Sequence, residues 1–230
     1  MHTSTNLSTR NAASAPTSNT GLPSVLARLR ALAPHRGLDR GSALGIAERQ
    51  ANLLLSLQNI TAAPVPLSAL SRMPRIDLGV AELPTSGLSY WNGVAWQLQA
   101  NRGEPEVRQR FTLAHEFKHV IDHPSRDLLY GSHIEREQTA DQFAACLLMP
   151  KRFVVRAWCS GQQDIDQLAE LFVVSTEAMT RRLLHLGLLT QRRPRPLYCS
   201  RRRSTALRGN RHFAIAGTRS THALSNGGHP

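Results

Sequence analysis

His115-Glu116-Phe117-Lys118-His119 places two imidazoles four positions apart, with a carboxylate directly after the first. On a helix, which rises roughly 5.4 Å per turn of 3.6 residues, both histidines project from the same face and can bind one metal ion. Glu116 lies about 100° around the helix from His115, so its carboxylate can reach a metal-bound water instead of the metal. If the stretch is helical, its spacing predicts a catalytic zinc site with Glu116 as general base.

The residues around this motif predict the helix that it requires. Apolar side chains recur at steps of three and four positions from 107 to 121, namely Phe111, Ala114, Phe117 and Ile121. Such a stripe marks the buried face of an amphipathic helix, and Pro124 ends it. A second helix is predicted from 134 to 149, where small and apolar residues again form an inward stripe and Pro150 closes the element.

A catalytic zinc site needs a third protein ligand and leaves the fourth position open. The second helix supplies the better candidate, Glu137, because Asp141 lies one turn beyond it on the same face. Asp141 is predicted to accept the free ring N–H of a ligating histidine and so to fix its tautomer. His123 lies eight residues after His115, roughly 12 Å further along a straight helix, and is expected to be a helix-end residue.

Further residues of reactive or aromatic type lie outside this set of ligands. Tyr130 and His133 are candidates for electrophilic groups that polarise a substrate carbonyl. The competing interpretation is that they are only solvated, as most loop residues of these types are. Cys146 is expected in the core, and Trp91 and Trp96 are expected to be packing groups.

The formal charge of +12 on 230 residues suggests a nucleic-acid partner until it is located along the chain. Residues 191–230 carry nine arginines and no acid, and residues 1–40 carry five arginines and one acid. Acidic and basic groups are nearly balanced in residues 41–190. Segments 1–41 and 191–230 are therefore predicted to be disordered basic ends, and the Arg-rich tail is expected to make only weak, non-specific nucleic-acid contacts.

Cysteine content and hydropathy indicate the cellular compartment in which the protein is expected. Cys146, Cys159 and Cys199 form no CxxC pair and no even set, so structural disulfides and a cysteine-type zinc site are not expected. The sequence has no run of 18 apolar residues, and its start lacks the apolar core of a secretory signal. We therefore expect a soluble cytoplasmic protein without membrane contact, and the acid-free start leaves a transit peptide as the less favoured alternative.

Between residues 67 and 103 the pattern changes from helical to alternating. Val94, Trp96 and Leu98 alternate with small or polar residues, as in a half-buried strand, which predicts a small sheet in this region. If this strand is an edge beside the metal site, it can hold an extended substrate by strand addition.

The pattern of residues 164–188 is typical of a helix-turn-helix. Asp164 is a predicted N-cap, Ser175 begins the next helix, and Arg181 and Arg182 lie on that second helix, where they could contact DNA. The alternative is that both helices only pack on the core or dock a substrate, and the segment's nearly balanced charge favours it.

Four segments of the chain together resemble the ImmA/IrrE family of zinc metallopeptidases. They are RFTLAHEFKHVIDH at 110–123, ExxADQFAACLLMP at 137–150, PVPLSAL at 64–70 and LAELFVVSTEAMTRRLLHLGLL at 168–189. The resemblance implies a mainly helical, zincin-like α+β fold over about residues 42–190, with a small β-sheet and a helix-turn-helix-like pair of helices at 164–190.

The resemblance also implies the ligands: zinc (Zn2+) on His115, His119 and Glu137, with Glu116 as base. The chain departs from the family at Lys118, where Gly or Ser is common, and at Cys146, where Glu is common. Neither departure removes a ligand, although Lys118 is expected to alter the electrostatics beside the site.

The expected function is that of a zinc-dependent endopeptidase. Members of the ImmA/IrrE family cleave helix-turn-helix repressors, so the resemblance implies such a repressor as the protein substrate and regulation of stress-response or mobile-element genes as the role. Two alternatives remain. One is a DNA-binding regulator with a structural or vestigial metal, and the other is an antitoxin-like module that binds a partner protein.

Overall fold

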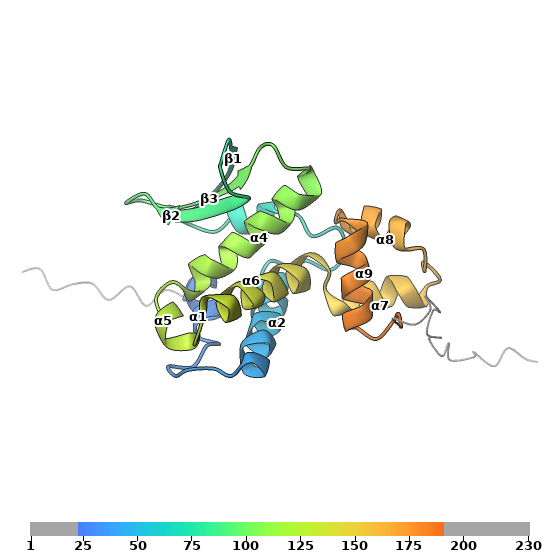
Figure 1. Ribbon diagram of the computed structural model, residues 1–230, viewed down its shortest axis with the longest axis horizontal. Coiled ribbons are helices and arrows are strands. Elements are labelled where there is room, and N and C mark those ends of the chain that lie inside the picture. Colours follow the sequence, from blue (N-terminus) through green and yellow to red (C-terminus); the bar gives the residue numbers. More distant parts are fainter. Residues whose placement is uncertain (1–22, 191–230) are drawn as a thin grey trace, which may run out of the picture. The chain divides into compact units, whose positions relative to one another are not determined.

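Residues 23–190 are described by the structure, a computed structural model, in which α4 lies between a small sheet and a second long helix, α6 (Figure 1). The helices are α1 (Val25–Arg30), α2 (Arg40–Leu57), α3 (Ser68–Ser71), α4 (Glu106–Asp122), α5 (Arg126–Leu129), α6 (His133–Leu148), α7 (Lys151–Cys159), α8 (Ile165–Phe172) and α9 (Thr176–His185). Within this range no helix has the length and apolarity needed to cross a bilayer. The Arg-rich tail and residues 1–22, with the predictions made for them, lie outside the described residues.

The strands β1 (Ile76–Ala81), β2 (Gly87–Trp91) and β3 (Trp96–Asn101) form a sheet in the order β1-β3-β2. β3 pairs in parallel with β1 and antiparallel with β2. The strand predicted around Val94 to Leu98 therefore exists as β3, but it is the central strand, so the condition that it forms an edge beside the metal site is not met. Alternation along one strand reports which face is buried and does not report the neighbouring strands. The edge next to α4 is β2.

The core that supports the site is built from α2, α4 and α6. α6 packs against both α2 and α4, and α4 packs against β2 and β3. Ala140 and Ala144 on α6 and Ala114 on α4 are fully buried, and small side chains at these positions let the helix axes approach. The rings of Phe117 and Phe143 lie 6.0 Å apart across the same interface. The predicted α+β class, mainly helical with a small sheet, is confirmed.

The ordered region starts earlier than residue 42, the predicted start of the domain. α1 buries Leu29 completely, and Arg30 donates to the carbonyl oxygens of Ile121 and Val120 at 3.1 and 2.9 Å. These carbonyls belong to the last turn of α4, where the backbone lacks intrahelical donors. Within the segment 1–41, predicted as a disordered basic end, residues 25–30 thus form a helix whose Arg30 caps the end of α4.

Pro150 ends α6, as predicted, and it also starts α7, which the sequence pattern did not reveal. Cys146 is a buried, free thiol, in agreement with its predicted place in the core. Cys159, in contrast, is disulfide-bonded, so the expectation of no structural disulfide is wrong for this residue. An odd number of cysteines rules out a completely paired set and does not rule out a single bridge.

The helices α8 and α9 form the pair expected at 164–190. Asp164 caps α8 by accepting from the Gln167 N–H at 2.9 Å, as predicted, and Ser175 caps α9. Between the helices, Val173 has φ of 53°, a left-handed conformation that reverses the chain. Its carbonyl accepts from Arg110 of α4 at 3.2 Å, so the turn is held against the metal-site helix.

Candidate metal centre

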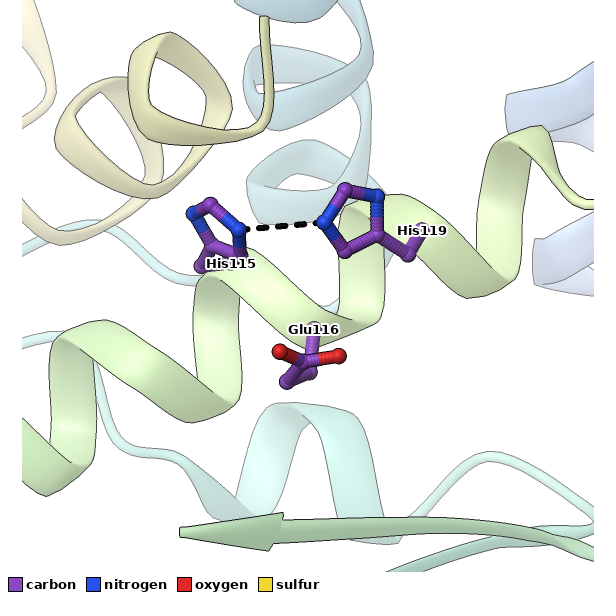
Figure 2. A group of neighbouring side chains, drawn as sticks. All are labelled: His115, Glu116 and His119. Atoms are coloured by element: carbon purple, nitrogen blue, oxygen red, sulfur yellow. Dashed lines mark hydrogen bonds between the residues drawn. The ribbon is translucent and has the colours of Figure 1, made fainter. Parts of the chain in front are cut away.

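His115, Glu116 and His119 lie in the middle of α4, where the helical periodicity turns the two imidazoles toward the same point (Figure 2). The Nε2 atoms of the two rings are 3.0 Å apart. Both rings are only partly exposed, because α4 is covered by the sheet on one side and by α6 on the other. Glu116 leaves the helix about 100° around from His115 (Figure 2), and one of its carboxylate oxygens lies within 4.8 Å of a nitrogen of each ring.

Glu137 of α6 joins this pair. Its Oε2 lies 3.2 Å from His115 Nε2 and its Oε1 lies 3.6 Å from His119 Nε2. Zinc bonded tetrahedrally at about 2.0–2.1 Å holds neighbouring donor atoms about 3.3 Å apart. The separations of 3.0, 3.2 and 3.6 Å, of which the last two end at different oxygens of Glu137, bracket that value, so the three side chains are close enough to bind one tetrahedral ion.

Asp141 lies one turn beyond Glu137 and contacts the other side of the first imidazole. Its Oδ1 is 2.9 Å from His115 Nδ1, a distance at which Nδ1–H donates to the carboxylate and leaves the Nε2 lone pair free. Burial lowers the pKa of His115, but the hydrogen bond and charge of Asp141 outweigh it and the pKa is raised overall. The pKa of His119 is lowered to about 4, by burial first and by the neighbouring charge of His115 second, so His119 presents an unprotonated nitrogen.

Glu116 faces the sheet. The hydroxyl of Ser89 on β2 donates to Glu116 Oε2 at 2.7 Å. Burial raises the pKa of Glu116 above its usual range, and the Ser89 hydrogen bond opposes this rise without cancelling it. A carboxylate in this state is a stronger base than one in water. Sequence analysis did not identify Ser89, since a lone serine 27 residues before Glu116 belongs to no motif.

Gly87 explains how β2 approaches α4 closely enough for this contact. A Cβ atom at this position would lie 2.2 Å from Thr112 Cγ2 and 2.8 Å from the carbonyl oxygen of Gln99. Any larger residue would have to push the strand away from the helix. The close approach also sets the width of the space beside Glu116.

A cleft of about 300 Å³ opens beside the candidate metal centre. One side consists of Gly87, Leu88 and Ser89 of β2, and Glu116 and His119 lie within it. The remaining lining comes from Trp96, the end of α4, Glu137 and two arginines, Arg126 and Arg136. The edge strand therefore shares one solvent-accessible space with Glu116, His119 and Glu137.

Other candidates lie apart from the three donor atoms. His123 is the C-cap of α4, as expected, and its ring packs against Trp96 with centroids 4.8 Å apart. Tyr130 donates to Asp122 inside the molecule and does not line the cleft, so its proposed electrophilic role is not supported. His133 is 70% exposed, with Nε2 3.5 Å from Glu137 Oε1, which places it at the rim of the site.

Lys118, the departure from the family, is buried beside the site. Its Nζ donates to both carboxylate oxygens of Asp122 at 2.5 Å, and Tyr130 completes the cluster. The charge of Lys118 is therefore compensated inside the helix and does not project into the cleft. Of the two tryptophans expected to pack, Trp96 is partly buried, whereas Trp91 is 43% exposed at the hairpin and contacts Trp96 edge to face.

The fold and comparisons with known families together define a metallopeptidase-like domain. Residues 77–184, just under half of the chain, match the family model described as the IrrE N-terminal-like domain, a peptidase family. The resemblance of the chain to ImmA/IrrE proteins is therefore confirmed over these residues.

Two further comparisons add little to the family match. No curated protein sequence matches the chain. A solved structure of a Mycobacterium tuberculosis transcriptional regulator is similar at 20% identity with a TM-score of 0.47, over 76% of this chain and 54% of that chain. The chain spans about half the length of that protein.

Proposed function

We propose that this protein is a zinc-dependent endopeptidase in which His115, His119 and Glu137 hold the ion and Glu116 is the general base. The observation that carries the proposal is the approach of two ring nitrogens of α4, 3.0 Å apart, and the Glu137 carboxylate of α6, whose oxygens lie 3.2 and 3.6 Å from them, close to the separation of donors around a tetrahedral ion. Zinc bound there would supply Lewis-acid polarisation of a carbonyl oxygen and of a water molecule.

Glu116 takes the proton from the attacking water and delivers it to the leaving amine. Its position beside Ser89 supports this role, because the serine hydroxyl occupies Oε2 and leaves Oε1 to contact water. Asp141 supports the metal site by holding the Nδ1–H of His115, which directs the Nε2 lone pair toward the other donor atoms.

The strand β2 binds the peptide in extended form. Within residues 23–190 it pairs with β3 alone, so its other edge is available for strand addition beside the cleft. Main-chain hydrogen bonds to this edge would place a scissile peptide bond next to Glu116 and His119, which line the same cleft. The substrate is therefore a segment that can be locally extended.

The resemblance to the ImmA/IrrE family extends the proposal to the substrate, a helix-turn-helix repressor. Cleavage of such a repressor would relieve repression of stress-response or mobile-element genes. This part of the proposal rests on the family alone, and the cleft adds only that the cleaved segment must reach an edge strand.

The experiment compares the wild-type chain with Glu116→Gln and, as a matched control, with Glu170→Gln, which makes the same chemical change on the exposed face of α8. Each protein is loaded with zinc and incubated with a repressor encoded beside its gene, and products are read by intact mass. Glu116→Gln should bind about one zinc per chain yet cleave about 10²- to 10⁴-fold more slowly, whereas Glu170→Gln should match wild type. Wild-type protein that stays metal-free in excess zinc, or normal cleavage by Glu116→Gln, would contradict the proposal.

A further inference from the structure

Two arginines line the cleft on the side formed by α5 and α6. Arg126 begins α5 and Arg136 lies in the first turns of α6. Both belong to the cleft that contains Glu116 and His119, and their side chains are 49% and 29% exposed. They are thus partly shielded from water and reachable from the same space as the proposed scissile bond.

Neither guanidinium has a short ion pair in the part of the chain that the structure describes. Arg126 Nε lies 3.5 Å from Asp127, whose own side chain is 92% exposed. Arg136 Nε lies 3.5 Å from Glu137 Oε1. Good N–H···O hydrogen bonds are about 2.9 Å long, and ion pairs with a solvated neighbour contribute little. Both arginines can therefore turn to an incoming carboxylate.

The other carboxylates of the cleft are already engaged. Asp122 accepts from Lys118 and from Tyr130, so it does not neutralise the arginines. Glu137, as a zinc ligand, would give an oxygen to the ion and loosen its contact with Arg136. Two positive charges would then face the peptide opposite β2.

We propose that Arg126 and Arg136 form a subsite for an acidic side chain of the substrate, so that the enzyme favours peptides with Asp or Glu beside the scissile bond. The inference rests on the proposed endopeptidase function and adds the charge of the substrate to it. The planar guanidinium presents paired donors that match a carboxylate, and such charge-assisted bonds are stronger than neutral ones.

The edge strand explains why one particular substrate position is selected. Successive side chains of an extended peptide point to opposite faces, so a peptide added to β2 directs only alternate side chains toward α5 and α6. The cleft volume of about 300 Å³ is lined by Ser89 on one side and by both arginines on the other. A single acidic side chain next to the cleaved bond is the group that this space suits.

The test uses zinc-loaded Glu116→Gln protein and fluorescein-labelled nine-residue peptides in which one Glu moves through the sequence, each paired with a Gln counterpart. Fluorescence anisotropy gives both affinities. At one or two positions the Glu peptide should bind about 10- to 100-fold more tightly than its Gln partner, the range expected for a hydrogen-bonded charge pair. Equal affinity of the two peptides at every position, including the absence of binding by either, overturns the subsite.

Variants assign the preference to the two arginines. The double variant Arg126→Gln/Arg136→Gln should lose it, and Arg126→Lys/Arg136→Lys should keep part of it, since lysine retains the charge without the paired donors. Arg181→Gln, an exposed position on α9, is the matched control and should keep all of it. A preference that survives in the double glutamine variant contradicts the assignment. Thermal denaturation of each variant identifies any loss of folding.

Failure of this inference is distinguishable from failure of the proposed function. If the wild-type protein takes up no zinc or cleaves no repressor, the endopeptidase function fails. If it cleaves a proteome-derived peptide mixture without enrichment of Asp or Glu at any position near the cut, only the acidic subsite fails.

Discussion

The helix pair α4–α6 and the helix pair α8–α9 use their polar side chains in opposite ways. In the first pair, His115, His119 and Glu137 turn toward one another across the interface, and His119 and Glu137 line a cleft. In the second pair, Arg182 is only 3% exposed and donates from Nε to the carbonyl oxygen of Met149, while Arg181 pairs with Glu177 at 2.6 Å. The first pair presents polar side chains to a cleft, whereas the second directs its arginines to partners within the protein.

This difference bears on the DNA-binding alternative. Arg182, one of the two arginines expected to contact DNA, cannot reach a phosphate from the core. The turn between the helices is held by Arg110 of α4, as a packing element would be. Of the interpretations offered for residues 164–188, packing on the peptidase core therefore agrees better with the structure than recognition of a DNA groove.

The largest effect is expected from Glu137→Ala, which removes one of three proposed zinc ligands. Changes to residues that only support a ligand weaken metal affinity by about 10- to 100-fold, so loss of a ligand itself should exceed about 100-fold. Competition with a chromophoric zinc chelator measures the affinity. Glu170→Ala, on the exposed face of α8, should leave it unchanged, and wild-type affinity in Glu137→Ala would remove α6 from the metal site.

Arg182→Ala should lower the free energy of unfolding by about 3 kcal/mol, because it leaves a buried cavity and an unpaired Met149 carbonyl. Arg182→Met should cost less, about 1 kcal/mol, since it fills the volume and also removes a buried Nη2 that lacks a hydrogen-bond partner in the described structure. Urea denaturation measures both values. Zinc affinity of the folded protein should stay as in wild type, and a loss of zinc binding by either variant would show that the two helix pairs are coupled.

The two helices that carry the proposed metal ligands, α4 and α6, were predictable because their sequence pattern depends only on residues close together in the chain. The four-residue step from His115 to His119 and the apolar stripe beside it depend only on helical periodicity, and α4 and α6 lie within one residue of the predicted ranges at both ends. Glu137 and Asp141 followed from the same rule on the next helix. The structure places both beside His115, at 3.2 and 2.9 Å.

The features that escaped prediction depend on contacts between distant segments. The position of β2 at the sheet edge, and its hydrogen bond from Ser89 to Glu116, join residues with no shared periodicity. The burial of Arg182 was also not predictable from the sequence. A helix-turn-helix pattern indicates where two helices lie but not which face of each helix meets the core.

Asp141→Ala removes the residue that supports the proposed ligand His115 and leaves all three proposed ligands in place. The variant takes away the acceptor of His115 Nδ1–H, so the imidazole is no longer fixed, and zinc affinity should fall by about 10- to 100-fold. Asp141→Asn should lie between this variant and wild type, because the amide oxygen still accepts the hydrogen bond but carries no charge. The chelator competition used for Glu137→Ala measures both. An affinity equal to wild type in Asp141→Ala would mean that packing alone orients His115.

The smallest effect is expected from Arg181→Ala on α9. The side chain is 78% exposed and its partner Glu177 is 75% exposed, so their contact is an exposed pair four residues apart on one helix. Such pairs contribute about 0.3–0.5 kcal/mol, and the free energy of unfolding should change by no more than that. The same variant should bind a DNA duplex as wild type does in a shift assay at 0.15 M salt, because a helix that only packs on the core makes no contact with DNA phosphates. A clear drop in sequence-specific DNA binding would instead assign α9 to recognition and reverse the contrast between the two helix pairs.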